Sequence, residues 1–460
     1  MKKRYLLLSM LIIPLVFFGS TGLYIILSPS LNLNNYPLEP GNYRPVQRDL
    51  NRYFSSPPLF SGGLVLEFNR WTAFVNMDLR QELSAFLMRK NFTNIPLSVG
   101  SFLPAVDMNF PRLGYIERID ENSHLSIGRR KLSFGPSTYS FVLSDTLPYF
   151  DHFWLRLSAD GRREGKYFYN FFAISADRTI YGAPKTLIGH RFGFMNDYLK
   201  ISFGEQNLIY GVYPDLQDLG PFLIYHHTYQ DRSNVTATLA GEFRIRESVL
   251  YGEFTLDDFR LKSEGPFSNP TAFGWLAGVS YQIKSGDVYS GPNFAVEEHS
   301  IKDDTIENGG GLNLRYEHYH STTYLYNRGE EIGKFTYPYR FNVMWLDSWP
   351  IVTGFFGFPY GPDSTVDLLA LEYQNADSFL SLSAEFIRRG AIDIDSPYSP
   401  PFDQNWYGLK EPITRSLLLS MKALFKVRTD TGLFVSGSLF FEDRVKFYMN
   451  LGFMKTLQLF

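Results

Sequence analysis

Apolar and polar residues alternate with a period of two along most of the chain after His124. At the C-terminal end, one parity is apolar from Phe447 to Leu459, and the other carries Lys446, Asn450 and Gln458. Period two places successive side chains on opposite faces of a strand. These strands therefore have one face suited to an apolar phase and one suited to water.

The same alternation predicts strands throughout the second two thirds of the chain. The predicted strands are 167–175, 187–195, 198–205, 236–246, 248–255, 275–283, 311–319, 366–374, 379–387, 416–427, 433–441 and 445–459. Their connectors are either very short, such as NDY, IRES and NADS, or long and polar, such as residues 285–309. Short turns at one end and long loops at the other are typical of an outer-membrane barrel, and the spacing accommodates about 16 to 18 strands.

A soluble β-sandwich or propeller is the alternative, because its strands also alternate. Its strands are shorter than the runs at 416–427 and 445–459, since soluble strands usually have about five to six residues. We therefore predict an all-β fold, a transmembrane antiparallel outer-membrane β-barrel with a short N-terminal helical segment.

The N-terminal part lacks this alternation. Residues 1–27 begin with basic residues and continue as an apolar run, which indicates a secretory signal peptide or an uncleaved N-terminal anchor. We assign residues 28–110 to a periplasmic or plug segment, with a candidate strand at 64–68 and one helix near 79–90. The barrel is expected to occupy residues 111–460.

Composition narrows the classes of function. Aromatic residues make up 17% of the chain, with 30 Tyr and 42 Phe, as expected for a barrel with aromatic girdles. The absence of cysteine excludes disulfides and thiolate sites. A net charge of −3 argues against nucleic acid as a partner. No phosphate-binding glycine loop, HExxH or GxSxG motif occurs, so we expect no cofactor and no catalytic residues.

Few residues suggest chemistry. His226 and His227 are adjacent, and adjacent strand residues point to opposite faces, so a shared metal ion is disfavoured. No spacing of Ser, His and Asn singles out a phospholipase site. Asp257 and Asp258, like the pair at 303 and 304, could serve as glycosidase carboxylates, but such pairs are more often solvated loop charges. The remaining polar and aromatic residues suit sugar binding.

A family resemblance rests on an ordered series of motifs. The stretch IGRRKLSFGPSTYSFVLSDTLPYFDHFWLRLS, residues 127–158, joins an arginine-containing strand, a Gly135-Pro136 turn and an Asp-x-x-Pro-aromatic pause to an outgoing strand. YLKISFGEQNLIYG, DRSNVTATLAGEFRIRESVLYGEFTLDDF, NRGEEIG and GFPYGPDSTVDLLALEY follow in order. On these motifs the chain resembles the family of the outer-membrane capsule assembly protein Wzi.

The resemblance implies an 18-stranded outer-membrane barrel that acts as a lectin, holding capsular or other surface polysaccharide without cleaving it. Two features depart from the family. Its members carry an N-terminal helical bundle, whereas one short helix is predicted here, so we expect a reduced plug. An aromatic-rich insertion at 335–355 also separates two family-like pieces.

We therefore predict a non-catalytic barrel in the outer membrane that binds polysaccharide, with a porin-like channel for small solutes as the alternative. The expected partners are outer-membrane lipid, surface polysaccharide and the outer-membrane insertion machinery, and the expected state is a monomer. The candidate ligand-binding residues are Arg129, Arg130, Ser144, Asp145, Tyr149, Asp151, Asn234, Arg328 and Asp363.

The same nine residues could instead form a structural hydrogen-bonded network inside the barrel. Charged groups facing lipid cost about 2–4 kcal/mol near the bilayer midplane. Arg129 and Arg130 therefore cannot both face lipid there. The Gly135-Pro136 turn and Pro148 predict a connector at the rim or a segment folded into the lumen, because proline is excluded from paired central strands.

Overall fold

A computed structural model describes most of the chain. The described residues are 20–34, 53–54, 56–81, 93–95, 112–161, 165–176, 178–220, 224–225, 232–261, 263–265, 267–293, 300–302, 306, 309–340, 351–402, 407–442 and 444–458.

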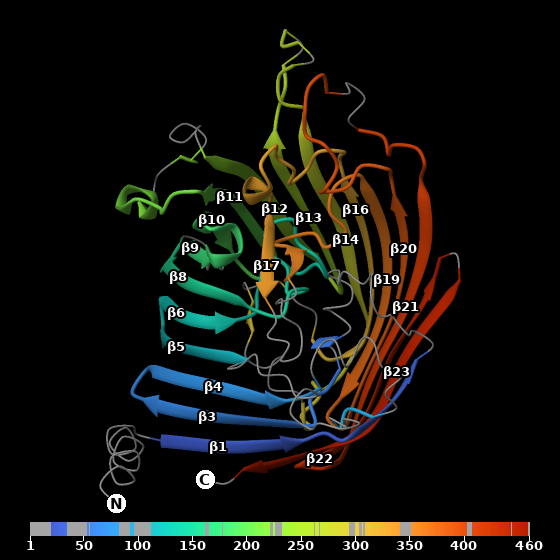
Figure 1. Ribbon diagram of the computed structural model, residues 1–460. Coiled ribbons are helices and arrows are strands. Elements are labelled where there is room, and N and C mark those ends of the chain that lie inside the picture. The colour runs from blue at the N-terminus through green and yellow to red at the C-terminus, as the bar shows by residue number, and fades with distance from the viewer. Residues whose placement is uncertain are drawn as a thin grey trace, which may run out of the picture.

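One closed antiparallel sheet forms the wall of a barrel (Figure 1). Its strands are β1 (Ser20–Leu27), β2 (Ser30–Asn34), β3 (Phe60–Phe68), β4 (Trp71–Leu79), β5 (Leu113–Asp120), β6 (Ser123–Arg130), β8 (Phe150–Asp160), β9 (Lys166–Ser175), β10 (Lys185–Met195), β11 (Leu199–Tyr210), β12 (Ser233–Ile245), β13 (Ser248–Asp258), β14 (Ala272–Ser285), β16 (Gly311–Ser321), β19 (Ser364–Asn375), β20 (Ser378–Arg389), β21 (Thr414–Arg428), β22 (Thr431–Phe441) and β23 (Val445–Gln458).

Each wall strand pairs with its neighbour in the chain, and the ring closes where β23 meets β1. Ile25 lies opposite Leu457 in this seam and opposite Gly62 of β3 on its other side. β2 continues the pairing with β23 in the same register, from Ser30 opposite Gly452. β1 and β2 therefore act as one interrupted strand, and the wall is an 18-stranded barrel.

The predicted alternation is confirmed on the wall. On β23, Leu451 and Phe453 are exposed, whereas Asn450 and Met454 are buried. The exposed apolar side chains of the other strands fall on the same outer face, as Leu369 does beside buried Leu368. An apolar outer face and a partly polar inner face are what a barrel in a bilayer requires.

The two ends of the barrel differ in their connections. Tight turns join β3 to β4, β5 to β6, β10 to β11, β12 to β13, β19 to β20 and β21 to β22 at one end. Longer segments, including 131–149, 259–271, 322–363 and 390–413, lie at the other end. Residues 286–310 break the rule, because this long segment joins β14 to β16 at the short-turn end. The expectation of long loops at one end only is corrected there.

Several connecting segments fold into the lumen. β17 (Thr336–Arg340) and β18 (Ile351–Phe355) form an antiparallel hairpin inside the ring, where β17 is drawn in orange (Figure 1). β7 (Leu132–Ser133) pairs in parallel with β15 (Ile301–Lys302). Segment 131–149 enters from the long-loop end and segment 286–310 from the short-turn end, so the two meet inside the barrel. Two alternatives were predicted for the stretch around Pro148, a connector at the rim or a segment folded into the lumen, and the structure shows the second.

The largest hydrophobic core lies between these inner segments and the wall. Phe134, Phe141 and Phe356 of the inner segments pack in one buried cluster with Trp154 and Tyr319 of the wall. Phe150 stacks on Phe356 with ring centroids 5.9 Å apart, and Tyr319 stacks on Phe358 at 5.3 Å. A close-packed aromatic interior of this kind fixes the inner segments in one position.

Helices are few and short among the described residues. Those that lie wholly within the described residues are α4 (Arg178–Tyr181) and the 3₁₀ turns η2 (Leu216–Leu219) and η3 (Glu331–Gly333). No helix in the described part of the chain has the length and apolar character needed to span a membrane. Most of the helix predicted near 79–90 lies outside the described residues, although Leu79 itself ends strand β4.

The structure differs from the sequence-based domain boundaries. Residues 20–27, assigned to a signal or anchor, form β1 of the wall, and residues 60–79 of the expected plug segment form β3 and β4. The barrel therefore begins well before residue 111. The physical reason is that Tyr24 and Ile26 face the interior and are themselves apolar or aromatic, Ile26 packing against Leu424 and Met454. Both faces of β1 are apolar, and this hides the period-two pattern.

Candidate functional site

Three of the nine predicted residues meet at the rim, where β6 ends and β8 begins. Arg129 and Asp151 are direct partners in the register. The guanidinium of Arg129 donates from Nε to Asp151 Oδ1 at 2.6 Å and from Nη2 to Oδ2 at 2.8 Å. It also lies over the ring of Tyr149, 4.2 Å from the centroid. We call Arg129, Tyr149 and Asp151 the rim cluster.

The rim cluster is held on one side by Tyr339 and is exposed on the other. The hydroxyl of Tyr339 on β17 donates to the backbone oxygen of Tyr149 at 2.7 Å, and the two rings are perpendicular at 5.3 Å. The side chains of Arg129 and Asp151 remain 29% and 43% exposed. A fixed aromatic ring beside a half-exposed, bidentate ion pair can bind a polar ligand without first being ordered.

Three other predicted residues belong to the inner face and the inner segment. Arg130 is buried, donates from Nη1 to Glu117 Oε2 at 2.7 Å, and lies 3.9 Å over the ring of Tyr115. Ser144 is also buried, and its backbone N–H donates to Phe356 O at 2.9 Å. Lys131 Nζ donates to the backbone oxygen of Asp145 at 2.9 Å. Arg130 thus faces inward, as the cost of two lipid-facing arginines requires.

The remaining three hold loops at the long-loop end. Asn234 Nδ2 donates to Gly333 O at 3.1 Å. Asp363 accepts the backbone N–H of Ile392 at 3.0 Å and that of Lys410 at 3.2 Å. These three loops and the rim cluster are separate, so the nine predicted residues do not form one site. The role of the buried ones as ligand contacts stays a prediction.

Arg328 bridges the acidic pair that the sequence suggested as glycosidase carboxylates. Its Nη2 donates to Asp257 Oδ1 at 2.9 Å, and its Nη1 lies 3.0 Å from Asp258 Oδ2. Burial alone would lower the pKa of the Arg328 guanidinium, but the two carboxylates outweigh burial and raise that pKa above its usual range. One charged group therefore engages both carboxylates. The pair at 303 and 304, like His226 and His227, lies outside the described residues.

Glutamates on the inner wall hold the segment at 136–141, and sequence reasoning missed them. Glu253 of β13 accepts from Ser140 Oγ at 2.9 Å and from Phe141 N at 2.6 Å. Glu317 of β16 accepts from Thr138 N at 3.0 Å, and Glu385 of β20 accepts from Tyr139 Oη at 2.9 Å. A signal was available, because each glutamate shares its strand parity with inward positions and must satisfy its charge inside.

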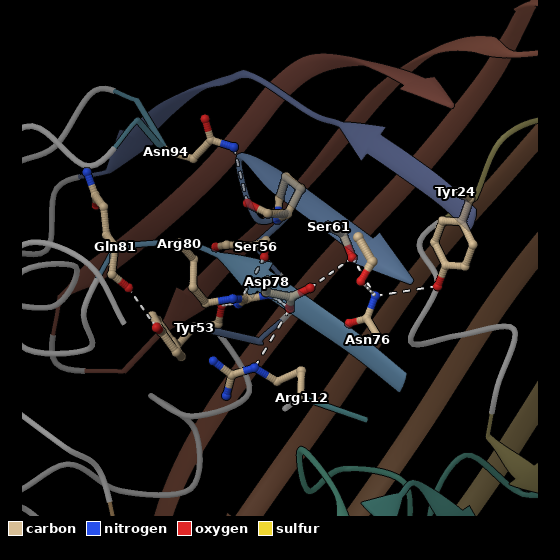
Figure 2. Close-up of polar contacts among 12 residues, drawn as sticks. Tyr24, Tyr53, Ser56, Ser61, Asn76, Asp78, Arg80, Gln81, Asn94 and Arg112 are labelled. Atoms are coloured by element: carbon tan, nitrogen blue, oxygen red, sulfur yellow. Dashed lines mark hydrogen bonds and ion pairs between the residues drawn. The ribbon is translucent and has the colours of Figure 1, made fainter. Parts of the chain in front are cut away.

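A second buried polar network supports the first strands of the wall (Figure 2). Asp78 accepts from Ser61 Oγ at 2.9 Å and from Arg80 Nη2 at 3.0 Å, and Arg112 Nε lies 3.7 Å away on the other side. Asn76 Nδ2 donates to Ser61 Oγ at 2.8 Å. These contacts tie β3 and β4 to the segments beside them.

A small polar hollow remains between the inner segment and the wall. It is lined by residues that include Arg191, Lys200, Glu242, Tyr251 and Glu253. Lys200 Nζ lies 3.3 Å from Glu242 Oε1. Among the described residues, no group of three His, Asp or Glu side chains could hold a metal ion.

Comparison with known proteins gives a structural likeness only. No family model matches the sequence, and no curated protein matches it. The fold is similar to Wzi of Escherichia coli, described as a carbohydrate-binding β-barrel involved in group 1 capsule assembly, with a TM-score of 0.53 and 13% identity over 94% of this chain and 83% of that one.

Two further barrels are more distant. OccD3 of Pseudomonas aeruginosa has a TM-score of 0.42 and 10% identity over 96% of this chain and 93% of that one. OccAB4 of Acinetobacter baumannii has a TM-score of 0.43 and 8% identity over 96% and 99%. The likeness to Wzi, the closed ring of strands and the apolar outer face lead to one conclusion: the protein is a β-barrel of the outer membrane.

Proposed function

We propose that this protein binds polysaccharide at the cell surface, without cleaving it, through the long-loop end of the barrel. The observation that carries the proposal is the rim cluster, in which an aromatic face and a half-exposed ion pair lie side by side. In outer-membrane barrels the short turns face the periplasm and the long loops face outward. The rim cluster then faces the exterior.

The chemistry of the rim cluster suits a sugar. Tyrosine rings stack on the apolar face of a pyranose, and charged side chains hydrogen-bond its hydroxyls. Asp151 keeps acceptor capacity on its exposed edge, since a carboxylate has about four lone-pair sites and Arg129 uses two. The likeness of the fold to Wzi, a carbohydrate-binding barrel, supports the same proposal.

A binding role without catalysis is supported by the state of the acidic pair. Arg328 contacts both Asp257 and Asp258, which are adjacent in the chain, whereas a glycosidase places its two carboxyl groups on either side of its substrate. We further propose that the protein works as a monomer placed in the membrane by the outer-membrane insertion machinery.

A channel for small solutes is the second candidate. The polar hollow lined by Arg191, Lys200 and Glu242 favours it, because charged lumen walls select solutes. The buried aromatic contacts between the inner segments and the wall favour the binding role instead.

Glycan-array binding and single-channel conductance of the purified full-length protein distinguish these functions. We expect glycan binding with little conductance, and Asp151→Asn should weaken binding roughly tenfold, since a lost hydrogen bond to a charged group is worth about 1.5–3 kcal/mol. Asp120→Asn is the matched control, because Asp120 pairs with Arg118 at the short-turn end. Steady porin-like conductance without glycan binding would overturn the proposal.

A further inference from the structure

We propose that a basic patch on the outer, lipid-facing side of the barrel binds the phosphate of a lipid headgroup in the outer leaflet. The patch lies near the long-loop end and consists of Arg388 of β20, Arg415 of β21, and His318 of β16 with Asp367 of β19. We call it the outer patch. It is separate from the rim cluster, and the inference does not depend on the proposed function.

The register and the burial pattern place these side chains on the outer face. Asp367 lies opposite His318, and Arg388 lies opposite Thr365. Asp367 shares its strand parity with exposed Leu369, whereas Val366 and Leu368 on the other parity are buried inside. Charged groups on this face need a specific partner, since the face otherwise meets hydrocarbon.

Asp367 organises the patch but does not neutralise it. Its Oδ1 lies 2.7 Å from His318 Nδ1 and accepts from Tyr316 Oη at 2.8 Å. Its Oδ2 accepts from Arg388 Nη2 at 3.2 Å. The side chain of Arg388 is nevertheless 36% exposed. One carboxylate thus fixes the geometry while a guanidinium edge stays open.

Arg415 is the residue that indicates an anion as the ligand of the outer patch. It lies directly opposite Arg388 in the register of β20 and β21, and like charges in directly opposed positions destabilise a sheet. In the part of the chain that the structure describes, no carboxylate lies within ion-pair distance of Arg415. A phosphate between the two guanidinium groups would remove the repulsion, because arginine binds phosphate through parallel N–H donors.

The position of the outer patch along the barrel axis indicates that a lipid supplies the phosphate. Arg388 is one residue from the end of β20, and Asp367 is three residues into β19, roughly 10 Å along the strand. The outer side of β19 then continues with Leu369 and Leu371. Trp275 contacts His318, with ring centroids 5.1 Å apart, and Trp and Tyr mark the headgroup level of a bilayer. The patch therefore lies where a lipid phosphate lies.

The experiment measures thermal unfolding of the full chain refolded in detergent, so that no native lipid is carried along. The probe is diphosphoryl lipid A, and dephosphorylated lipid A and inorganic phosphate are the other arms. Diphosphoryl lipid A should raise the midpoint by several degrees, and the double variant Arg388→Gln, Arg415→Gln should lose most of that rise. Arg118→Gln, next to Trp71 on β4 at the short-turn end, should keep the full rise.

The single variant Arg415→Gln distinguishes a loss of lipid binding from a loss of folding stability. Arg415→Gln removes the repulsion, so without lipid its midpoint should equal or exceed that of the unaltered protein, while its rise with diphosphoryl lipid A should be smaller. An equal rise in the unaltered protein and the double variant would overturn the proposal. A rise of the same size with inorganic phosphate or with dephosphorylated lipid A would overturn the assignment to a lipid phosphate.

Discussion

Gly128 directly precedes Arg129 and Arg130 at the end of β6, and its backbone conformation affects where the two arginines point. Its φ of +136° lies in a region that L side chains rarely adopt. A Cβ at this position would lie 2.3 Å from Gly114 O and 2.6 Å from Tyr115 Cα. The glycine lets β6 twist at its last residues, so that Arg129 reaches Asp151 while Arg130 turns inward to Glu117.

Gly128→Ala should therefore destabilise the barrel by about 1–3 kcal/mol, the usual cost of one strained backbone position. It should also weaken polysaccharide binding, because the rim cluster loses its geometry. Urea unfolding followed by loss of heat-modifiable migration measures the first effect. Gly265→Ala is the control, since a Cβ there meets nothing within 4 Å, and equal unfolding midpoints for the two variants would contradict this account.

Three of the nine residues selected from the sequence lie together, and there is a physical reason for this. Arg129, Tyr149 and Asp151 could be selected as polar residues flanking an interrupted strand, and two of them do form a direct pair. Their pairing could not be read from the sequence, because a 19-residue excursion between β6 and β8 separates them and only the register brings them together. Ser144, Asn234 and Asp363 share the same composition cues but are buried.

At the scale of elements, the inner segment at 136–141 is held by wall glutamates on β13, β16 and β20. Glu253 contributes two of these hydrogen bonds, to Ser140 and Phe141. Because the segment has no strand partners of its own along this stretch, its position depends on such contacts. The wall glutamates therefore fix the position of this connector by hydrogen bonds.

Glu253→Leu should release the inner segment. Each donor left without an acceptor costs about 1–3 kcal/mol, so the unfolding midpoint should fall, and single-channel recordings should show larger or noisier conductance. Glu253→Gln keeps one acceptor oxygen and nearly the same volume, and it should behave much more like the unaltered protein. Identical behaviour of the Leu and Gln variants would argue against the anchoring role.

β1 is the element that sequence reasoning assigned to the wrong part of the protein. The wall strands from β9 onward were placed to within a few residues, as with 275–283 against Ala272–Ser285, because most of them alternate polar with apolar positions. β1 has no polar face, since Tyr24 stands over Gly63 and Ile26 packs in an apolar cluster. Length and apolarity alone do not distinguish such a strand from a signal peptide.

Cysteine pairs test the position of β1 directly, because the chain has no cysteine of its own. Leu23 and Leu64 are register partners, and opposed residues of an antiparallel pair have Cα atoms within the range of a disulfide. Leu23→Cys with Leu64→Cys should crosslink under oxidation and shift mobility on a non-reducing gel. Leu23→Cys with Val65→Cys should not crosslink, because neighbouring strand positions face opposite sides.

At the scale of the whole molecule, inner segments occupy part of the lumen of the barrel among the described residues. Inner segments enter from both ends and meet at the β7–β15 bridge, and the β17–β18 hairpin occupies the centre of the ring (Figure 1). The sequence predicted the wall, whose pattern repeats, but of this filling it offered only a lumenal segment around Pro148, as one of two alternatives. The inner segments are aromatic and irregular, and their contacts are with distant parts of the chain, such as Tyr326 Oη with Phe141 O.

Replacing residues 336–355 by a short Gly-Ser linker tests whether the inner hairpin obstructs the lumen without being needed for the fold of the wall. We expect the barrel to remain folded, because the hairpin contributes no strand to the ring, and the conductance to rise several-fold as the lumen opens. Circular dichroism and heat-modifiable migration check the fold, and planar-bilayer recordings check the conductance. Unchanged conductance in a folded variant would contradict the view of the hairpin as an obstruction.

The seam between β1 and β23 also has a consequence for the order of assembly. It joins residues 24–34 to residues 448–458, so the contacts that close the ring have nearly the largest sequence separation the chain allows. Such contacts form late, because the loop entropy of closing them must first be offset by local pairing. The inner segments belong to the chain between the two seam strands, so we expect them to reach their places while the ring is still open. Closure of the seam would then enclose an interior that is already packed.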